Sequence, residues 1–66
     1  MNIVVNGKET AVEQGTTVTA LIAQYKLSPK TVIVELRGDV MKREAFDTTV
    51  LTPGDTVELV QFVGGG

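Results

Sequence analysis

The sequence of 66 residues contains no cysteine and no histidine, and each absence removes a class of chemistry. Without cysteine the chain has no disulfide, no thiol nucleophile and no thiolate to bind a metal. Without histidine it also lacks the commonest general base and the commonest metal ligand. The eight acidic residues are scattered along the chain rather than paired. We therefore expect no metal site, no bound cofactor and no catalytic residue within the chain itself.

Aromatic and basic residues are also few: the chain has one tyrosine, two phenylalanines and six lysines or arginines. Proteins that bind nucleic acid usually present a basic stripe with aromatic side chains that stack on bases. Here the longest basic run is Lys42-Arg43, so nucleic acid is not an expected partner. No apolar run approaches the roughly 20 residues that span a bilayer, and the N-terminus lacks a signal-peptide pattern. These features predict a cytoplasmic protein without a membrane partner.

The chain does contain enough apolar sequence for one small domain. Hydrophobic residues make up 42% of the composition, a share typical of globular proteins. Ile3 and Val5 stand two residues apart, in the alternating pattern that predicts a strand. Asn6-Gly7 follows, the dipeptide that favours a two-residue hairpin turn with positive φ at both positions. Residues 8–13 are then expected to form the returning strand.

A single helix is predicted after this hairpin. Four apolar or aromatic residues follow the spacing i, i+3, i+4 and i+7, which places them on one helical face: Val18, Leu21, Ile22 and Tyr25. Thr17 is the expected N-cap, because its hydroxyl can accept a hydrogen bond from a free N–H of the first turn. Pro29 disfavours helical geometry at the preceding residue. The pattern therefore predicts a helix over residues 18–26.

Three further strands are predicted after the helix, over residues 31–36, 40–41 and 56–63. Residues 42–47 read as an irregular or single-turn stretch. Thr52-Pro53-Gly54-Asp55 precedes the last strand and has the composition of a tight turn. Proline presets φ at its second position, and glycine permits a positive φ at its third.

This order of elements predicts an α+β fold in which one helix covers one face of a mixed sheet of four to five strands. The crossing through the helix lets the last strand pair with the first in parallel. The other face of the sheet should then be open to solvent. The expected core consists of ten apolar residues: Ile3, Val5, Val18, Leu21, Ile22, Val32, Val34, Leu36, Val57 and Leu59.

The C-terminus ends on Gly64-Gly65-Gly66, directly after the predicted last strand. Residues without side chains add nothing to a core, and glycine loses more conformational freedom on ordering than any other residue. What such residues offer is a slim backbone that ends in an unhindered α-carboxylate. We interpret residues 1–63 as the folded domain and residues 64–66 as a tail that presents this carboxylate. A frayed end without a role is the alternative reading.

Several segments of the chain, taken with the order of elements and the tail, match the pattern of a known family. These segments are Asn6-Gly7, Gly15-Thr16-Thr17-Val18, Leu21-Ile22, Val34-Glu35-Leu36 with Gly38, Arg43-Glu44, Pro53-Gly54-Asp55 and residues 60–66. With them the chain resembles the β-grasp, ubiquitin-like proteins, and more closely the ThiS family of small sulfur carriers of thiamine biosynthesis. Three residues differ from the pattern typical of that family: Arg37 where asparagine often precedes the glycine, Phe46 where tryptophan is common, and Pro53 where an acidic residue is frequent.

The resemblance implies chemistry at the C-terminal carboxylate of Gly66. In this family ATP, used by an activating partner, converts the carboxylate to an acyl-adenylate, and a sulfur nucleophile displaces the adenylate to leave a thiocarboxylate. The implied partners are an E1-like adenylyltransferase, a thiazole synthase and a sulfur donor system that draws on cysteine. The carrier itself is not an enzyme. Gly64 and Gly65 would give the terminal carboxylate access to a narrow site.

A docking surface is predicted from the alternation of the last strand. If Val57 and Leu59 face the helix, residues at even positions point to the open face of the sheet. Apolar side chains there would form a patch at the base of the tail, with carboxylates that can meet basic groups of a partner. The docking residues that we expect are Val4, Glu35, Glu58, Val60 and Phe62. Arg43-Glu44 is expected to form a local ion pair or cap.

Three alternatives remain open at this stage. A sulfur carrier of the molybdopterin synthase type has the same fold and tail. A ubiquitin-like modifier that joins its tail to lysine amines would use the same activated carboxylate. A β-grasp binding module with an idle tail belongs to a different functional class, and deletion of the last glycines would separate it from the others.

Overall fold

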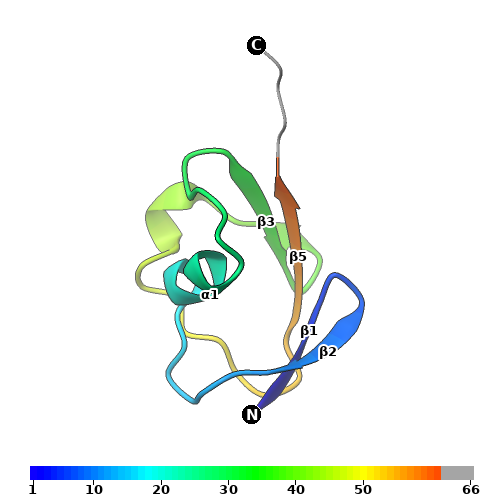
Figure 1. The fold of residues 1–66 in the computed structure, drawn as a ribbon. Helices are drawn as coiled ribbons and strands as arrows, with labels where there is room; N and C mark the ends of the chain where they lie inside the picture. Colours follow the sequence, from blue (N-terminus) through cyan, green and yellow to red (C-terminus); the bar gives the residue numbers. More distant parts are fainter. Residues whose placement is uncertain (62–66) are drawn as a thin grey trace.

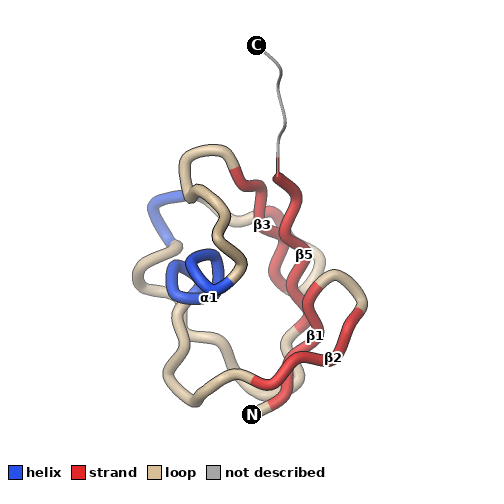
Figure 2. Tube along the Cα trace, viewed as in Figure 1, coloured by secondary structure: helices blue, strands red, loops and turns tan. Residues whose placement is uncertain are grey.

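The computed structural model of the chain describes residues 1–61 and contains a five-stranded mixed sheet with one α-helix on one of its faces (Figures 1 and 2). The strands follow one another across the sheet in the order β2-β1-β5-β3-β4. This is the predicted α+β arrangement. The elements are β1 (Asn2–Val5), β2 (Lys8–Ala11), α1 (Val18–Gln24), β3 (Val32–Leu36), β4 (Asp39–Val40), the 3₁₀ turn η1 (Arg43–Ala45) and β5 (Thr56–Gln61).

The hairpin between β1 and β2 forms where the Asn6-Gly7 pair predicts it. Both residues have positive φ, +52° at Asn6 and +79° at Gly7, as the predicted turn requires. The returning strand is shorter than the predicted residues 8–13, because β2 ends at Ala11. The hydrogen bonding between the two strands continues for one more pair of residues, since the Val12 N–H donates to the Met1 carbonyl over 2.8 Å.

The helix begins as predicted but ends earlier. The Thr17 hydroxyl accepts a hydrogen bond from the Ala20 N–H, so the expected cap is confirmed. The helix ends at Gln24 rather than at residue 26, because Lys26 adopts a φ of +56° and turns the chain. The N–H groups of Lys26 and Leu27 donate back to the last turn, which closes the helix without glycine. Tyr25, predicted as the last member of the helical face, is therefore the residue that follows the helix, and it is 39% exposed.

The last strand, β5, is the central strand of the sheet. It pairs in parallel with β1, with Val5 opposite Val57, as predicted from the helical crossing. It pairs antiparallel with β3 along five positions, from Leu36 opposite Val57 to Val32 opposite Gln61. The predicted strand over residues 31–36 begins one residue later, at Val32. Residues 62 and 63, the predicted end of the last strand, lie outside the described residues.

The hydrophobic core fills the space between the helix and the sheet. All ten residues predicted for it are buried. Three further residues complete it: Val12, Phe46 and Leu51. Residues 46–51 reach the core because backbone hydrogen bonds tie this segment to the start of the helix, with Thr49 accepting from Val18 and Leu51 donating to Thr16. The irregular stretch thus closes one end of the core.

The short edge strand carries the chain back along β3. It covers Asp39–Val40 rather than the predicted residues 40–41, with Val40 opposite Glu35. The Met41 N–H then donates to the Val34 carbonyl over 2.8 Å, so the chain runs antiparallel to β3 towards the beginning of that strand. The predicted single-turn stretch follows as η1.

Candidate functional site

The chain leaves the described fold from its central strand. β5 pairs with β1 at Thr56 and Val57 on one side, and with β3 as far as Gln61 on the other. The side-chain amide of Gln61 also donates to the Thr31 hydroxyl over 2.8 Å, which joins the end of β5 to the residue before β3. The predicted reactive tail, Gly64-Gly65-Gly66, and the predicted docking residue Phe62 lie outside the described residues.

The side chain of Asn6 holds β5 where the pairing with β1 has ended. Its amide nitrogen donates to the Leu59 carbonyl over 3.3 Å, and its amide oxygen accepts from the Leu59 N–H over 2.8 Å. These two bonds replace a pair of backbone ladder bonds. The residue that predicts the hairpin turn therefore has a second role, which is to hold the strand that leads into the tail.

Four of the five predicted docking residues are described, and all four lie on the three middle strands of the sheet, β1, β3 and β5. Val60 is 52% exposed, and Val4 is half-buried on β1. A shallow hollow of about 360 Å³ lies on the open face of the sheet, with Val4, Glu35 and Glu58 among its lining residues. The sequence pattern therefore brings these side chains to one surface, as expected.

Two exposed apolar residues extend this surface beyond the predicted set. Ile33 lies directly opposite Val60 in the β3–β5 pairing and is 42% exposed. Val40 lies opposite Glu35 on the edge strand and is 67% exposed. The sequence contains the signal for Ile33, because β3 alternates buried and exposed residues. Val40 could be placed only once the register of the edge strand was known.

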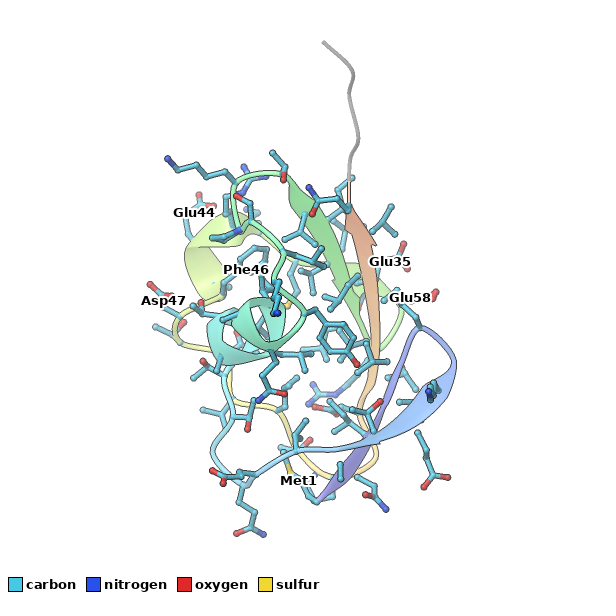
Figure 3. All side chains as sticks on the ribbon, in the orientation of Figure 1. Met1, Glu35, Glu44, Phe46, Asp47 and Glu58 are labelled. Carbon is cyan, nitrogen blue, oxygen red and sulfur yellow. The ribbon has the colours of Figure 1, made fainter. Side chains whose placement is uncertain are left out.

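The two predicted acidic docking residues face each other across the sheet. Glu35 and Glu58 are direct partners in the antiparallel pairing of β3 and β5, and Figure 3 shows both on the same side of the molecule. Like charges directly opposite each other destabilise a sheet. The pair therefore gives the open face a concentrated negative charge between its apolar residues.

A different pair of charges stabilises the turn before β5. Asp55 is 5% exposed, and its carboxylate accepts from the Arg37 Nε over 2.7 Å and from the Thr52 N–H over 2.8 Å. Burial raises the pKa of the Asp55 carboxyl, but the hydrogen bonds from Arg37 and Thr52 outweigh burial and hold that pKa below its usual range. Sequence reasoning did not find this pair, because its members are 18 residues apart.

Arg43 has a structural partner other than the predicted one. Its Nε donates to the Pro29 carbonyl over 2.7 Å, which joins η1 to the loop before β3. The expected ion pair with Glu44 is not formed, and the salt bridge found within residues 1–61 is the one between Arg37 and Asp55. Arg43 thus fixes the position of a loop near the end of β5.

The described residues offer little else that could act as a site. Within residues 1–61 there is no group of three or more acidic residues close enough to hold a metal ion. In the same part of the chain, no helix has the length and apolar character needed to cross a membrane.

Comparison with known proteins places the chain among carriers of sulfur. The model of the ThiS family matches residues 2–66. The sulfur carrier protein ThiS of Bacillus subtilis is 39% identical over 62 residues, which cover 92% of this chain and 94% of that protein. The crystal structure of the thiamine biosynthesis protein ThiS from Geobacter metallireducens has a TM-score of 0.84 and 45% identity, with 100% of both chains covered.

Two longer proteins contain a region similar to the whole chain. The thiazole synthases of Magnetococcus marinus and Paramagnetospirillum magneticum are 36% and 30% identical to it over 66 residues. In each case the match covers 100% of this chain but 20% of the thiazole synthase. A domain of this kind therefore also occurs as part of a larger polypeptide.

Proposed function

The chain belongs to the ThiS family of sulfur carrier proteins, and from this membership we propose that it carries sulfur as a thiocarboxylate on its C-terminal Gly66. Its role is that of a sulfur carrier in thiamine biosynthesis. The observation that carries the proposal is that the family match extends through the final residue. The fold agrees, because the central strand leads directly to the five residues that end in that carboxylate.

The chemistry requires activation of a poor electrophile. A carboxylate repels nucleophiles by its charge and has no good leaving group. In the first step the Gly66 carboxylate attacks the α-phosphate of ATP, which forms an acyl-adenylate and releases pyrophosphate. The terminal sulfur of a donor persulfide then attacks the acyl carbon and displaces AMP, which gives an acyl disulfide. A second thiol reduces its S–S bond, which leaves the thiocarboxylate and a disulfide on the donor side.

In this proposal the carrier contributes the substrate group and a docking surface, and its partners contribute catalysis. An E1-like adenylyltransferase binds ATP and activates Gly66. A cysteine-derived donor supplies the sulfur. A thiazole synthase receives it, which the similarity to a region of two longer thiazole synthases supports. A cytoplasmic location gives the protein access to ATP and to the sulfur donor.

Glycine at the last positions suits a tail that must enter the active sites of several partners. Gly64 and Gly65 place no Cβ beside the reacting carbonyl, so a narrow site can admit the backbone. Five residues follow Gln61, and a fully extended chain of that length spans at most about 17 Å. The body must therefore dock close to each partner's active site, and docking offsets the entropy lost when the tail is ordered.

The docking surface in this proposal is the open face of the sheet, with Val4, Glu35, Glu58, Val60 and Phe62. Replacement of Val60 by serine is expected to raise the KM of the activating enzyme for the carrier about fivefold, because an apolar contact in the interface is lost. Val50→Ser is the matched control, since Val50 is exposed to 49% and Val60 to 52% but Val50 lies outside the strands of the sheet. Steady-state pyrophosphate release measures both variants, and an equal KM for them would contradict this surface.

The proposed function is tested by the intact mass of the carrier after incubation with ATP, the activating enzyme and the sulfur donor. A gain of about 16 Da is expected, because one sulfur replaces one oxygen. A series of larger conjugates would instead indicate a ubiquitin-like modifier. A second carrier that the same enzyme is known to activate serves as the positive control. If that carrier gained the mass and this chain did not, the proposal would be wrong.

A further inference from the structure

The basic residues of the chain are unevenly distributed. Five of the six lie between positions 26 and 43, although the chain as a whole carries a net charge of −2. All five are exposed, and three of them, Lys30, Lys42 and Arg43, belong to neighbouring segments. Within residues 1–61 the ammonium groups of the two lysines take part in no hydrogen bond or salt bridge, so their charges serve no contact of the described fold.

The fold gathers these three residues although they are up to 13 positions apart. The bond from Arg43 to the Pro29 carbonyl brings Lys42-Arg43 beside the loop that contains Lys30. Their neighbours of opposite charge are Glu44 and Asp47, and the Asp47 carboxylate is already bound by the Thr19 hydroxyl. Figure 3 shows Glu44 and Asp47 on the η1 side of the molecule, away from Glu35 and Glu58.

The same end of the molecule is the one from which the C-terminal residues continue. Gln61, the last described residue, pairs with Val32 and donates to Thr31, the residue that follows Lys30. Figure 1 shows the loop between α1 and β3 beside the tip of β5, with η1 next to that loop. A body docked so that residues 62–66 enter a partner therefore turns this end of the molecule towards that partner.

We infer that Lys30, Lys42 and Arg43 form a second docking surface, the exit-end basic surface, which contacts a carboxylate-bearing surface of the adenylating enzyme. This inference rests on the proposed function, because it assumes that residues 62–66 enter that enzyme. A protein surface fits better than a nucleotide, since the side chains are exposed and none of them lines the hollow on the open face.

Two docking surfaces of opposite charge fix one orientation of the carrier. The open face presents Glu35 and Glu58, whereas the exit-end basic surface presents cations. Complementary charges at the edge of an interface guide encounter and suppress wrong orientations more than they add affinity. The expected effect is therefore on the KM for the carrier and on its salt dependence, and not on the rate of the bound complex.

The test is the double variant Lys30→Glu/Lys42→Glu, assayed with the adenylating enzyme by pyrophosphate exchange. Both side chains are exposed, so the variant should fold, which a thermal melt checks. We expect the KM for the carrier to rise about tenfold at low salt with kcat within twofold of the wild type, because two attractions become repulsions. The difference from the wild type should shrink at high salt. Lys8→Glu is the matched control, because Lys8 is exposed on β2 at the opposite edge of the sheet, and its KM should stay within twofold.

Other results would overturn the inference. The double variant changes the net charge by −4 and Lys8→Glu by −2, so a rise of about threefold in the KM of Lys8→Glu, half of the tenfold effect on a logarithmic scale, would mean that only net charge matters. A change in the KM for ATP, with that for the carrier unchanged, would mean that the lysines meet nucleotide phosphate instead of protein carboxylates. If the wild-type carrier itself were not adenylated, the proposed function would fail first. If the wild type were adenylated and the double variant behaved like it, the second docking surface alone would be wrong.

Discussion

Removal of Gly65 and Gly66 is expected to abolish the gain in mass completely while the protein stays folded. The reacting carboxylate would then belong to Gly64, two residues closer to the body, and could no longer reach the position at which ATP is attacked. The folded body should persist, because the core extends from Ile3 to Leu59. Intact mass after incubation measures the first effect, and a thermal melt measures the second.

A C-terminal amide of the full-length chain separates reach from chemistry. It keeps the length and the docking surfaces but removes the carboxylate oxygen that attacks ATP. We expect no gain in mass and competitive inhibition of wild-type activation, because the amide still docks. Adenylation of the amide form, or of the shortened chain at the wild-type rate, would show that Gly66 is not the reacting residue.

Replacement of Asp55 by alanine is expected to cause the largest loss of stability among changes outside the core. Its carboxylate accepts hydrogen bonds from the side chains of Arg37 and Thr52 and from the Thr52 N–H. The change should lower the free energy of unfolding by about 2–3 kcal/mol at pH 7, since charge-assisted bonds are lost and a partly buried N–H is left without its partner. Urea denaturation measures it, and Asp39→Ala, an exposed change on the edge strand, should stay within about 0.5 kcal/mol.

The same carboxylate predicts how stability depends on pH. The pKa of Asp55 is lower in the folded protein than its ordinary value, because the hydrogen bonds from Arg37 and Thr52 outweigh burial. Its contribution is therefore fully present above the unfolded value of about 3.9 and is lost as pH falls through the lower folded value. The wild type and Asp55→Ala should converge in stability at acid pH. A gap of constant size from pH 7 to pH 2 would contradict this role.

The sequence predicted the hairpin turn and the start of the helix, because each is determined by residues close together in the chain. Asn6-Gly7 specifies its turn through two positive φ angles, and Thr17 caps the helix through a bond three residues away. The end of the helix was not predictable in this way, because Lys26 takes a positive φ where glycine is the usual signal. For the same reason the predicted helix extended too far and included Tyr25, which is the C-cap.

Features that depend on tertiary pairing were beyond sequence reasoning. Phe46 departs from the tryptophan typical of the family, yet at 4% exposure it fills the core beneath a stretch without regular pattern. Arg37 stands where the family typically has asparagine, and its side chain forms a salt bridge with Asp55, in the turn before β5. At the candidate site, the role proposed for Gly66 comes from the family resemblance of the sequence, and Gly66 lies outside the described residues. The approach of Lys42-Arg43 to the Lys30 loop appears only when the edge strand is placed beside β3.

The central position of β5 has a mechanical consequence. A partner that draws the C-terminal residues into its site pulls along the axis of a strand that is bonded to β1, to β3 and to the amide of Asn6. Tension in that direction loads both ladders in shear, so many hydrogen bonds must break together, whereas a strand at the edge could peel away one bond at a time. Under the proposed function, we therefore expect the fold to withstand a pull on its last residues when the carrier passes from one enzyme to the next.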